Sequence, residues 1–191
     1  MQVHDWQAIV KDCGPLVWQT AYRLLGNHTD AADCFQETFL AALELSRREP
    51  VRNVSGLLVR LATTRAIDRL RQRGRQEHRQ ADGCDCEELT AGESDPASHA
   101  QTHELAGRLR EAIGRLPGQE AQAFCLRYLN DMSYRQIARE LDMGINTVGV
   151  ALYRAKARLR EDLGVAQTDE GNPKGDTWHL GTRDEVHNEE T

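Results

Sequence analysis

The chain has 191 residues, of which 39% are hydrophobic and 28% charged, and its formal net charge at pH 7 is −6. This length suits one medium-sized domain or two small ones. No stretch of about 18 apolar residues is present, and the N-terminus lacks the basic-then-apolar pattern of a secretory signal. We therefore expect a cytoplasmic protein without a membrane span, in which the five cysteines are reduced thiols.

The charge is distributed unevenly along the chain. Residues 1–79 carry a net +3, residues 80–104 a net −7, residues 105–163 a net +3 and residues 164–191 a net −5. This pattern predicts two basic domains, joined by a flexible acidic linker at 80–104 and followed by an acidic disordered tail. Within the first domain, residues 47–79 hold ten arginines and three acidic residues. Such a cluster is typical of a polyanion-binding face, although a solvated helix face has the same composition.

Apolar residues recur at three- and four-residue steps through the first domain, which predicts helices there. The first helix covers residues 6–25, and we expect Gly14-Pro15 to bend or break it. Thr29 or Asp30 is expected to cap the second helix.

Residues 47–53, which include Pro50, are expected to form a loop before the third helix. Ser55 is expected to open that helix, which continues into the arginine-rich end near Arg73. No alternating apolar pattern is long enough to predict a strand. We therefore predict an all-α fold made of two small helical domains.

The second domain, residues 105–163, ends in two helices that are separated by a short turn. Ser133 and Gln136 have the spacing of a capping box and predict a helix that starts at Tyr134. A three-residue turn that contains Gly144 follows, and the last helix starts near Asn146. This spacing is typical of a helix-turn-helix motif, which an ordinary helical hairpin would share. The two helices are expected to pack through Ile137, Ala138, Leu141, Ile145, Val148 and Leu152.

Three segments resemble bacterial RNA polymerase sigma factors of the small extracytoplasmic-function (ECF) group. Residues 30–40, DAADCFQETFL, resemble the helix by which these proteins bind polymerase, and residues 61–71, LATTRAIDRLR, resemble the helix that engages the minus-ten promoter element. Residues 116–155 resemble the helix-turn-helix that reads the minus-thirty-five element. The resemblance covers about residues 10–163, and it rests on the motifs occurring in this order and at this separation.

The resemblance implies which side chains make each contact. Core RNA polymerase is expected to bind Asp30, Asp33, Gln36 and Glu37. The minus-ten element is expected to contact Arg52, Asn53, Arg60, Thr64, Arg65, Arg69, Arg71 and Arg73. The minus-thirty-five element is expected to contact Ser133, Arg135, Asn146, Thr147, Val150, Tyr153, Arg154, Lys156 and Arg158. The resemblance also implies an anti-sigma regulator as a partner.

The chain departs from the family at two sites. Leu57 and Thr64 stand where the family usually has Trp and Asn, so aromatic stacking on a melted strand is not available at position 57. Gly149 and Val150 stand where polar or basic residues are common. Base recognition by hydrogen bonds is therefore expected to be sparse, with apolar contact to a thymine methyl as an alternative.

Other functions would depend on other features of the chain. A helix-turn-helix regulator that does not bind polymerase, or a pure interaction protein, would not need the acidic face of the second helix. Cys84 and Cys86 with His99 and His103 resemble a zinc set, but one residue between the cysteines is tighter than usual. A redox role for the two cysteines stays open. No phosphate-binding loop or nucleophile motif is present, so we expect neither enzymatic activity nor a metal or other cofactor.

Overall fold

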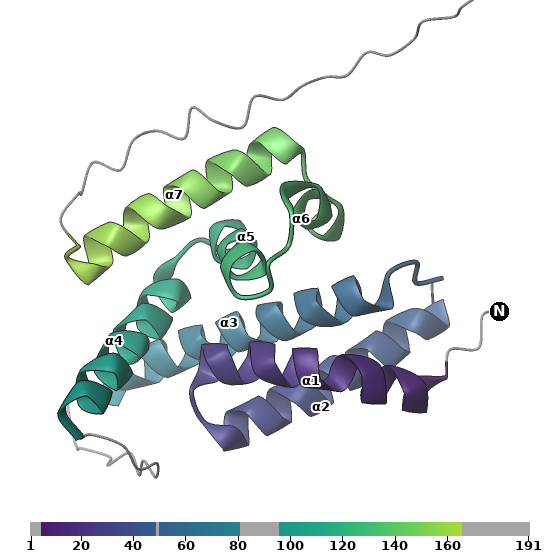
Figure 1. Ribbon diagram of the computed structural model, residues 1–191, viewed down its shortest axis with the longest axis horizontal. Coiled ribbons are helices and arrows are strands. Elements are labelled where there is room, and N and C mark those ends of the chain that lie inside the picture. Colours follow the sequence, from purple (N-terminus) through teal and green to yellow (C-terminus); the bar gives the residue numbers. More distant parts are fainter. Residues whose placement is uncertain (1–4, 49, 81–95, 166–191) are drawn as a thin grey trace, which may run out of the picture.

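The computed structural model describes residues 5–48, 50–80 and 96–165, which form seven α-helices and no strand. This confirms the predicted all-α class. The helices are α1 (Trp6–Leu25), α2 (His28–Arg48), α3 (Val54–Gln80), α4 (Pro96–Arg115), α5 (Gly118–Tyr128), α6 (Tyr134–Glu140) and α7 (Ile145–Leu163). Helices α1–α3 form a first block and α4–α7 a second block, and α3 lies between α1 and α2 on one side and α5 and α6 on the other (Figure 1).

Helix α1 runs unbroken through Gly14 and Pro15, so the expected bend or break at this dipeptide is wrong. Gly14 is buried, and a Cβ there would lie 3.7 Å from the ring of Phe35 on α2, whereas Pro15 is exposed. The free energy gained by packing α1 against α2 and α3 therefore outweighs the cost of the backbone hydrogen bond that the proline removes. Asp5 caps the start of the helix, where its carboxylate accepts from two backbone amides, and Gly26, with φ of 75°, caps the end.

Two helix starts lie earlier than predicted. The side chain of Asn27 accepts a 2.8 Å hydrogen bond from the Asp30 amide, so α2 is capped by Asn27 rather than by Thr29 or Asp30. The side chain of Asn53 likewise accepts from the Gly56 amide at 3.1 Å and caps α3 in place of Ser55. In both cases an Asn that lies two or three residues before the predicted cap accepts a hydrogen bond from a backbone amide of the first turn.

The helices also extend further than predicted. Helix α2 continues to Arg48 into the expected loop, α3 continues beyond Arg73 to Gln80, and α4 starts at Pro96. Residues 96–104 are therefore helical rather than part of a flexible linker. The rest of that linker, with Cys84 and Cys86, lies outside the described residues, as do the side chain of His99 and the tail from residue 166.

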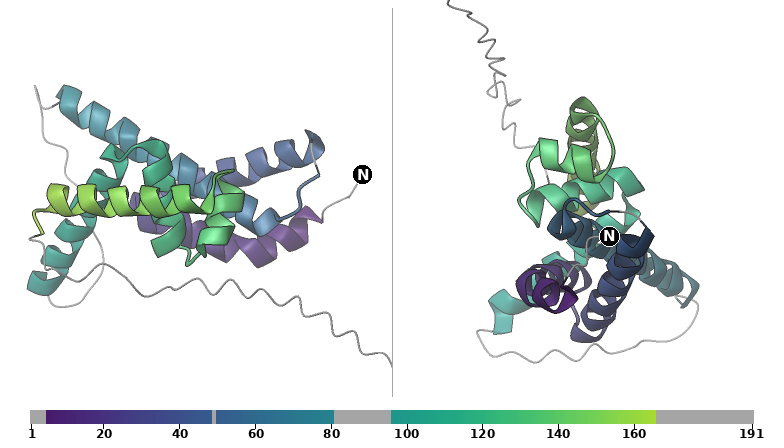
Figure 2. Two further views of the ribbon diagram at one scale, coloured as in Figure 1. Left: turned by 90° about the horizontal axis from the view of Figure 1, so that it is seen from above. Right: turned by 90° about the vertical axis from the view of Figure 1, so that its right-hand side faces the viewer.

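The two blocks are joined by shared hydrophobic clusters. Ile67 and Leu70 of α3 belong to the same buried cluster as Ile113 of α4, Cys125 of α5 and Leu159 of α7. A second cluster joins the helix-turn-helix to α3 and contains Val59, Leu126, Ile137, Val148 and Leu152. The right-hand view of Figure 2 shows the same stacking of the second block on the first. An interface of this apolar character holds two units together, whereas a polar one would let them move freely.

Candidate polymerase and nucleic-acid interfaces

Three carboxylates, which we call the acidic ridge, lie along one face of α2: Asp30, Asp33 and Glu37. Their spacing of three and four residues places them above one another on a helix. The side chains of Asp33 and Glu37 are 56% and 52% exposed, and that of Asp30 is 29% exposed. Gln36, the fourth residue predicted to bind polymerase, is also exposed on α2. The ridge is therefore partly open to solvent, and Asp33 and Glu37 are its most exposed carboxylates.

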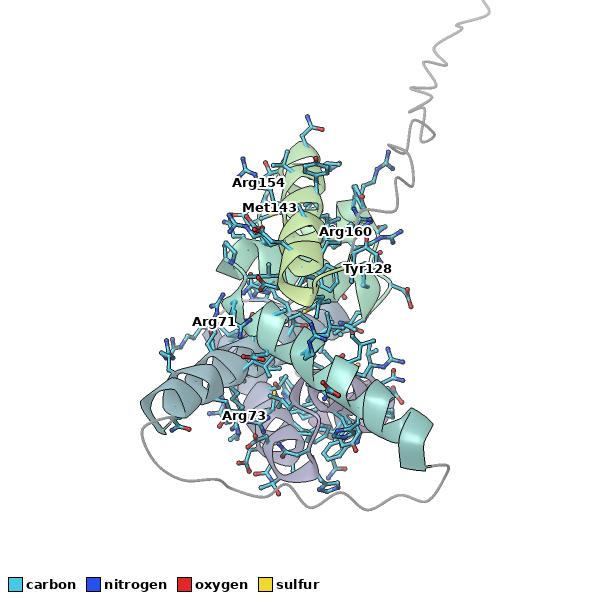
Figure 3. The ribbon with its side chains drawn as sticks, turned by 90° about the vertical axis from the view of Figure 1, so that its left-hand side faces the viewer. Arg71, Arg73, Tyr128, Met143, Arg154 and Arg160 are labelled. Atoms are coloured by element: carbon cyan, nitrogen blue, oxygen red, sulfur yellow. The ribbon has the colours of Figure 1, made fainter. Side chains whose placement is uncertain are left out.

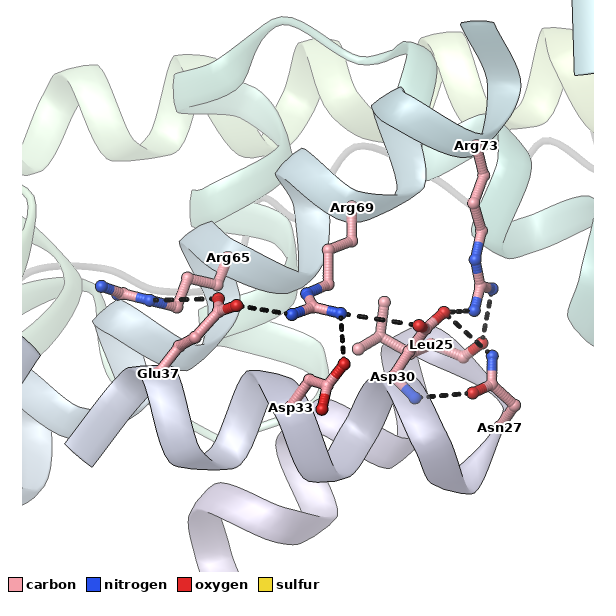
Figure 4. A network of polar contacts seen from close by, with 8 residues as sticks. All are labelled: Leu25, Asn27, Asp30, Asp33, Glu37, Arg65, Arg69 and Arg73. Atoms are coloured by element: carbon pink, nitrogen blue, oxygen red, sulfur yellow. Dashed lines mark hydrogen bonds and ion pairs between the residues drawn. The ribbon is translucent and has the colours of Figure 1, made fainter. Parts of the chain in front are cut away.

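Arg69 of α3 lies opposite the middle of the acidic ridge (Figure 4). Its Nη2 donates to Glu37 Oε1 at 2.7 Å, and its Nη1 lies 3.5 Å from Asp30 Oδ1 and 3.6 Å from Asp33 Oδ2. Arg65 Nε lies 3.9 Å from Glu37 Oε2, on one side of Arg69. One guanidinium thus touches all three carboxylates of the ridge.

Arg73 closes the other end of this network at the turn between α1 and α2. It pairs with Asp30 and donates a 3.0 Å hydrogen bond to the Leu25 carbonyl at the C-terminus of α1. A cation at a helix C-terminus is favourable because the last carbonyls lack intrahelical donors. Side chains predicted to bind polymerase and side chains predicted to bind the minus-ten element are therefore partners of one another.

Other residues of the predicted minus-ten set face the second block. Gln122 Nε2 on α5 donates to Thr64 Oγ1 at 3.0 Å, and Asn53 Nδ2 donates to Glu140 Oε1 on α6 at 2.7 Å. Arg71 donates to the carbonyl of Leu116 at 2.8 Å and to that of Gly114 at 3.3 Å. Arg71 lies where the two blocks meet (Figure 3). These three side chains thus bind elements more than 40 residues away in the sequence.

The two remaining residues of the predicted minus-ten set, Arg52 and Arg60, differ in burial. Arg52 is exposed in the loop before α3. Arg60 is half-buried, and its Nε is buried without a hydrogen-bond partner among the described residues. The eight predicted minus-ten residues therefore divide between the acidic ridge, the second block and solvent, and they do not form one open surface.

The helix-turn-helix has the geometry that its sequence predicts. The capping box is present: the Ser133 amide donates to Gln136 Oε1 at 2.8 Å, and the Gln136 amide donates to Ser133 Oγ at 3.3 Å. Asp142 adopts a left-handed conformation with φ of 50°, which makes the tight turn before α7. Ile145, expected to pack inside, is 37% exposed, because it is the first residue of α7.

The N-terminal half of α7 presents an outer face with apolar side chains at its centre. Val150 is 48% exposed and Tyr153 is 77% exposed. Asn146, Thr147 and Arg154 are exposed around them, and Figure 3 shows Arg154 projecting from α7. Ser133 and Arg135, at the start of α6, are exposed as well. In helix-turn-helix proteins the second helix enters the major groove with its N-terminal residues against the base edges.

The two cations that follow on α7 have partners within the second block. Lys156 Nζ lies 5.1 Å from the centroid of the Tyr128 ring, and Arg158 Nε lies 3.1 Å from the buried carboxylate of Glu120. Both Tyr128 and Glu120 belong to α5. Lys156 and Arg158 therefore attach α7 to α5.

Two thiols lie deep in the core. Burial raises the pKa of Cys125 to about 12, and burial also raises the pKa of Cys34, an effect that a hydrogen bond with Thr38 opposes. Such thiols are poor nucleophiles and poor metal ligands. Within the described ranges, no three His, Cys, Asp or Glu side chains are placed so that they could hold a metal ion together, and no helix is long and apolar enough to cross a membrane.

The polar partners that join the two blocks could not be predicted from the sequence. Gln122 and Glu140 bind residues 58 and 87 positions away, and Thr20 of α1 donates a 2.7 Å hydrogen bond to Asn130, which is 110 positions away. Helix periodicity and capping signals act over a few residues. They contain no information about which polar side chains meet across the core.

Comparison with known proteins identifies the family. Residues 9–76 match the model for Sigma-70 region 2, and residues 106–159 match that for Sigma-70 region 4. The chain is 30% identical over 149 residues to the RNA polymerase sigma factor SigV of Bacillus subtilis, with 76% of this chain and 83% of SigV covered.

Two further relatives are described as ECF RNA polymerase sigma factors. SigW of Bacillus subtilis is 29% identical over 154 residues, covering 77% of this chain and 82% of SigW. SigE of Mycolicibacterium smegmatis is 29% identical over 159 residues, covering 83% of this chain, which spans 62% of the length of SigE.

The fold also matches that of a solved structure. The sigma factor RpoE of Bartonella quintana, crystallised with the anti-sigma factor NepR, superposes with a TM-score of 0.54 at 23% identity, covering 86% of this chain and all of RpoE. The order of the two matched regions agrees with the order of the acidic helix α2 and the helix-turn-helix in the structure. The chain belongs to the RNA polymerase sigma factors, in their ECF group.

Proposed function

We propose that the chain binds core RNA polymerase through the acidic ridge and Gln36 on α2, and that it directs polymerase to promoters recognised by α3 and α7. The observation that carries this proposal is the ridge itself. Asp33 and Glu37 are more than half exposed although each lies near an arginine, and exposed carboxylates at helical spacing suit a basic partner surface. A helix-turn-helix regulator that acts without polymerase has no need of such a face.

On the promoter, the two helical blocks have different tasks in this proposal. In this proposal the minus-ten element is contacted by Arg52, Asn53, Arg60, Thr64, Arg65, Arg69, Arg71 and Arg73. A melted strand exposes phosphates and unstacked bases, and cationic side chains beside hydroxyl and amide groups can hold both. Leu57 is buried, so it offers no platform for stacking, and the holding of the strand falls to the polar side chains.

The minus-thirty-five element is bound by Ser133, Arg135, Asn146, Thr147, Val150, Tyr153, Arg154, Lys156 and Arg158. Val150 and Tyr153 form the apolar centre of this face, and Arg154 is the exposed cation beside them. An apolar side chain in the major groove discriminates thymine by its methyl group. We therefore infer that recognition of this element depends on thymine contacts more than on hydrogen bonds.

The proposal extends to regulation. RpoE was crystallised with an anti-sigma factor, and we infer that an anti-sigma protein likewise holds this chain away from core polymerase.

Transcription from purified components tests the function. The chain is added to core polymerase that lacks any sigma factor, with genomic fragments as template, and run-off transcripts are sequenced. We expect new transcripts with defined start sites that share two upstream elements, and none without the chain. Binding to DNA without core-dependent transcripts would instead support a regulator that acts apart from polymerase.

A further inference from the structure

We propose that an apolar groove along α1 binds a segment of this chain's own C-terminal tail, residues 176–183, DTWHLGTR. The groove follows one stripe of α1 from Asp12 to Arg23 and has a volume of about 650 Å³. Ligand pockets in proteins have volumes of this order, so the groove has room for a large side chain. None of its lining residues belongs to the proposed polymerase or DNA surfaces, so this proposal is independent of the proposed function.

The groove has an aromatic wall that is open to solvent. Leu16 is 37% exposed and Tyr22 is 47% exposed. The Tyr22 ring stacks on that of Trp18, with the ring centroids 6.3 Å apart and the planes inclined by 15°. Trp18 in turn packs edge-on against Phe35 of α2 at 6.2 Å. Because α2 holds the wall in place before a ligand arrives, binding there requires little further ordering of the groove.

The tail carries one short apolar segment. Residues 166–191 contain seven acidic and two basic residues, and their only large apolar residues are Trp178, Leu180 and Val186. Residues two positions apart face the same side of an extended chain, so Trp178 and Leu180 can enter one groove together. A tryptophan has about 150–250 Å² of surface to bury. The exposed rings of the α1 groove offer that surface a partner in the same molecule.

The charges at the ends of the segment match those at the ends of the groove. Asp12 and Arg23 are eleven residues apart on α1, or about 16 Å along the helix axis. Asp176 and Arg183 are seven residues apart, or up to about 23 Å in an extended chain. If the segment runs antiparallel to α1, Asp176 meets Arg23 and Arg183 meets Asp12, while the apolar residues between them meet the aromatic wall.

The start of the tail lies on the side of the groove that this direction requires. Arg108 of α4 donates to the Leu163 carbonyl at the end of α7 at 3.2 Å, and Arg110 Nε donates to the Arg23 carbonyl at 3.2 Å. The last turns of α7 and α1 therefore meet the same part of α4. From residue 165 to residue 176 the chain advances eleven residues, which span up to about 36–40 Å. The tail thus reaches the Arg23 end of the groove first, with Asp176 leading.

The groove and its ligand belong to one chain, which raises the effective concentration of the segment to the millimolar range. A peptide from another protein has to compete with the tail for the groove. The same segment of a second copy of the chain has identical chemistry but lacks this advantage. The tail of the same chain is therefore the expected occupant.

Photo-cross-linking in the full chain tests the inference. The photoreactive residue p-benzoylphenylalanine replaces Trp178, the protein is irradiated, and cross-linked tryptic peptides are identified by mass spectrometry. Trypsin cleaves after Lys11 and Arg23, so the groove is contained in a single peptide, residues 12–23. We expect this peptide to be the main cross-linked product. The same photoreactive residue in place of Val186 is the matched control and should label the peptide severalfold less.

Variants of the groove and of the tail separate recognition from proximity. Tyr22→Ala removes part of the aromatic wall and should lower the yield of the cross-link severalfold. Tyr128→Ala is the matched control, because Tyr128 is 43% exposed and its ring also packs on another ring, that of Phe124, at 4.8 Å. Its yield should stay within about twofold of the wild type. Leu180→Ser should lower the yield as Tyr22→Ala does, without changing a residue of the seven helices, and circular dichroism checks that every variant is folded.

Mixing the photoreactive chain with a ¹⁵N-labelled chain that lacks the photoreactive residue identifies the copy that is bound. We expect the cross-linked peptide 12–23 to be unlabelled. A mainly ¹⁵N-labelled peptide would overturn the proposal and assign the groove to the tail of a second copy. Cross-links scattered over the chain, or a yield that Tyr22→Ala and Leu180→Ser leave unchanged, would also overturn it. Transcription with core polymerase is measured separately, so its failure would bear only on the proposed function.

Discussion

Reversal of one charge in the acidic ridge gives the most direct test of polymerase binding. In Asp33→Arg the substituted side chain is exposed, and the lost contact is a 3.6 Å approach to Arg69. An exposed ion pair contributes about 0–1 kcal/mol, and the new arginine adds a repulsion of similar size. Arg69 keeps its 2.7 Å bond to Glu37. We therefore expect the free energy of unfolding to fall by no more than about 2 kcal/mol, against about 5–15 kcal/mol for a typical domain.

The expected effect on binding is larger. A charge placed against a like-charged partner surface costs several kcal/mol, and about 2 kcal/mol already corresponds to a loss near 30-fold. The assay titrates fluorescently labelled chain with core polymerase, and urea unfolding followed by circular dichroism measures stability on the same samples. The variant should remain folded and lose at least about 30-fold in core affinity.

Asp68→Arg provides the matched control for this experiment. Asp68 is 58% exposed on α3, and its Oδ1 lies 3.5 Å from Arg71 Nη1, so the charge change, exposure and lost ion pair resemble those at Asp33. Core affinity of this variant should stay within about threefold of the wild type. If Asp33→Arg also stays within that range while folded, the acidic ridge does not bind polymerase and the reasoning is refuted.

Three further predictions follow from promoter contacts, core packing and thiol burial. Arg154→Ala should weaken binding to the upstream promoter element by about 1–3 kcal/mol with relaxed sequence preference if it contacts a base. A reduced salt dependence with unchanged preference would assign Arg154 to phosphate. Leu126 is fully buried, so Leu126→Ala should lower the free energy of unfolding by about 2–5 kcal/mol in urea titrations, and a loss below about 1 kcal/mol would contradict the packing. Since burial raises the pKa of Cys125 to about 12 from 9.0, the native chain keeps this thiol protonated where the unfolded chain does not. Stability should therefore fall as pH rises from 9 toward 12, and Cys125→Ala should lack that part of the loss.

Local signals in the sequence predicted much of the second block. Three of its features depend only on residues within a few positions of one another. They are the capping box of Ser133 and Gln136, the turn at Asp142 to Gly144 and the exposed face of α7. Such features are determined by backbone hydrogen bonding and helix periodicity. The structure therefore agrees with the predicted helix-turn-helix except at Ile145, where the start of the helix leaves the side chain half exposed.

Prediction failed where distant contacts decide the outcome. Pro15 should end a helix by its own chemistry, but α1 continues through it because Gly14 packs against Phe35 of α2. The loop at residues 47–53 is shorter than expected because α2 extends to Arg48 and Asn53 already caps α3. The contacts of Thr64 and Asn53 with the second block depend on tertiary packing, and no spacing in the sequence encodes them.

The arginine-rich segment shows why composition overstates an electrostatic surface. Residues 47–79 carry a net +7 by sequence, which predicts a polyanion-binding face. In the structure Arg65, Arg69 and Arg73 are paired with the acidic ridge, and Arg71 binds carbonyls of α4. Arg52 is among those left exposed. The positive field of the free chain is therefore weaker than its arginine count implies.

This arrangement couples the two surfaces of the first block. A basic partner on the acidic ridge competes with Arg65 and Arg69 for Glu37 and Asp33, because each carboxylate has few acceptor sites and each pair is partly exposed. Arginines released by that competition become available to phosphates. Asp33→Asn should then slightly raise the affinity of the free chain for single-stranded DNA, because Arg69 loses one of its three carboxylate partners. Asp68→Asn should raise this affinity much less, because the Gly114 and Leu116 carbonyls still bind Arg71. Equal gains in the two variants, measured by anisotropy at low salt, would show that only net charge matters and that the pairing has no role.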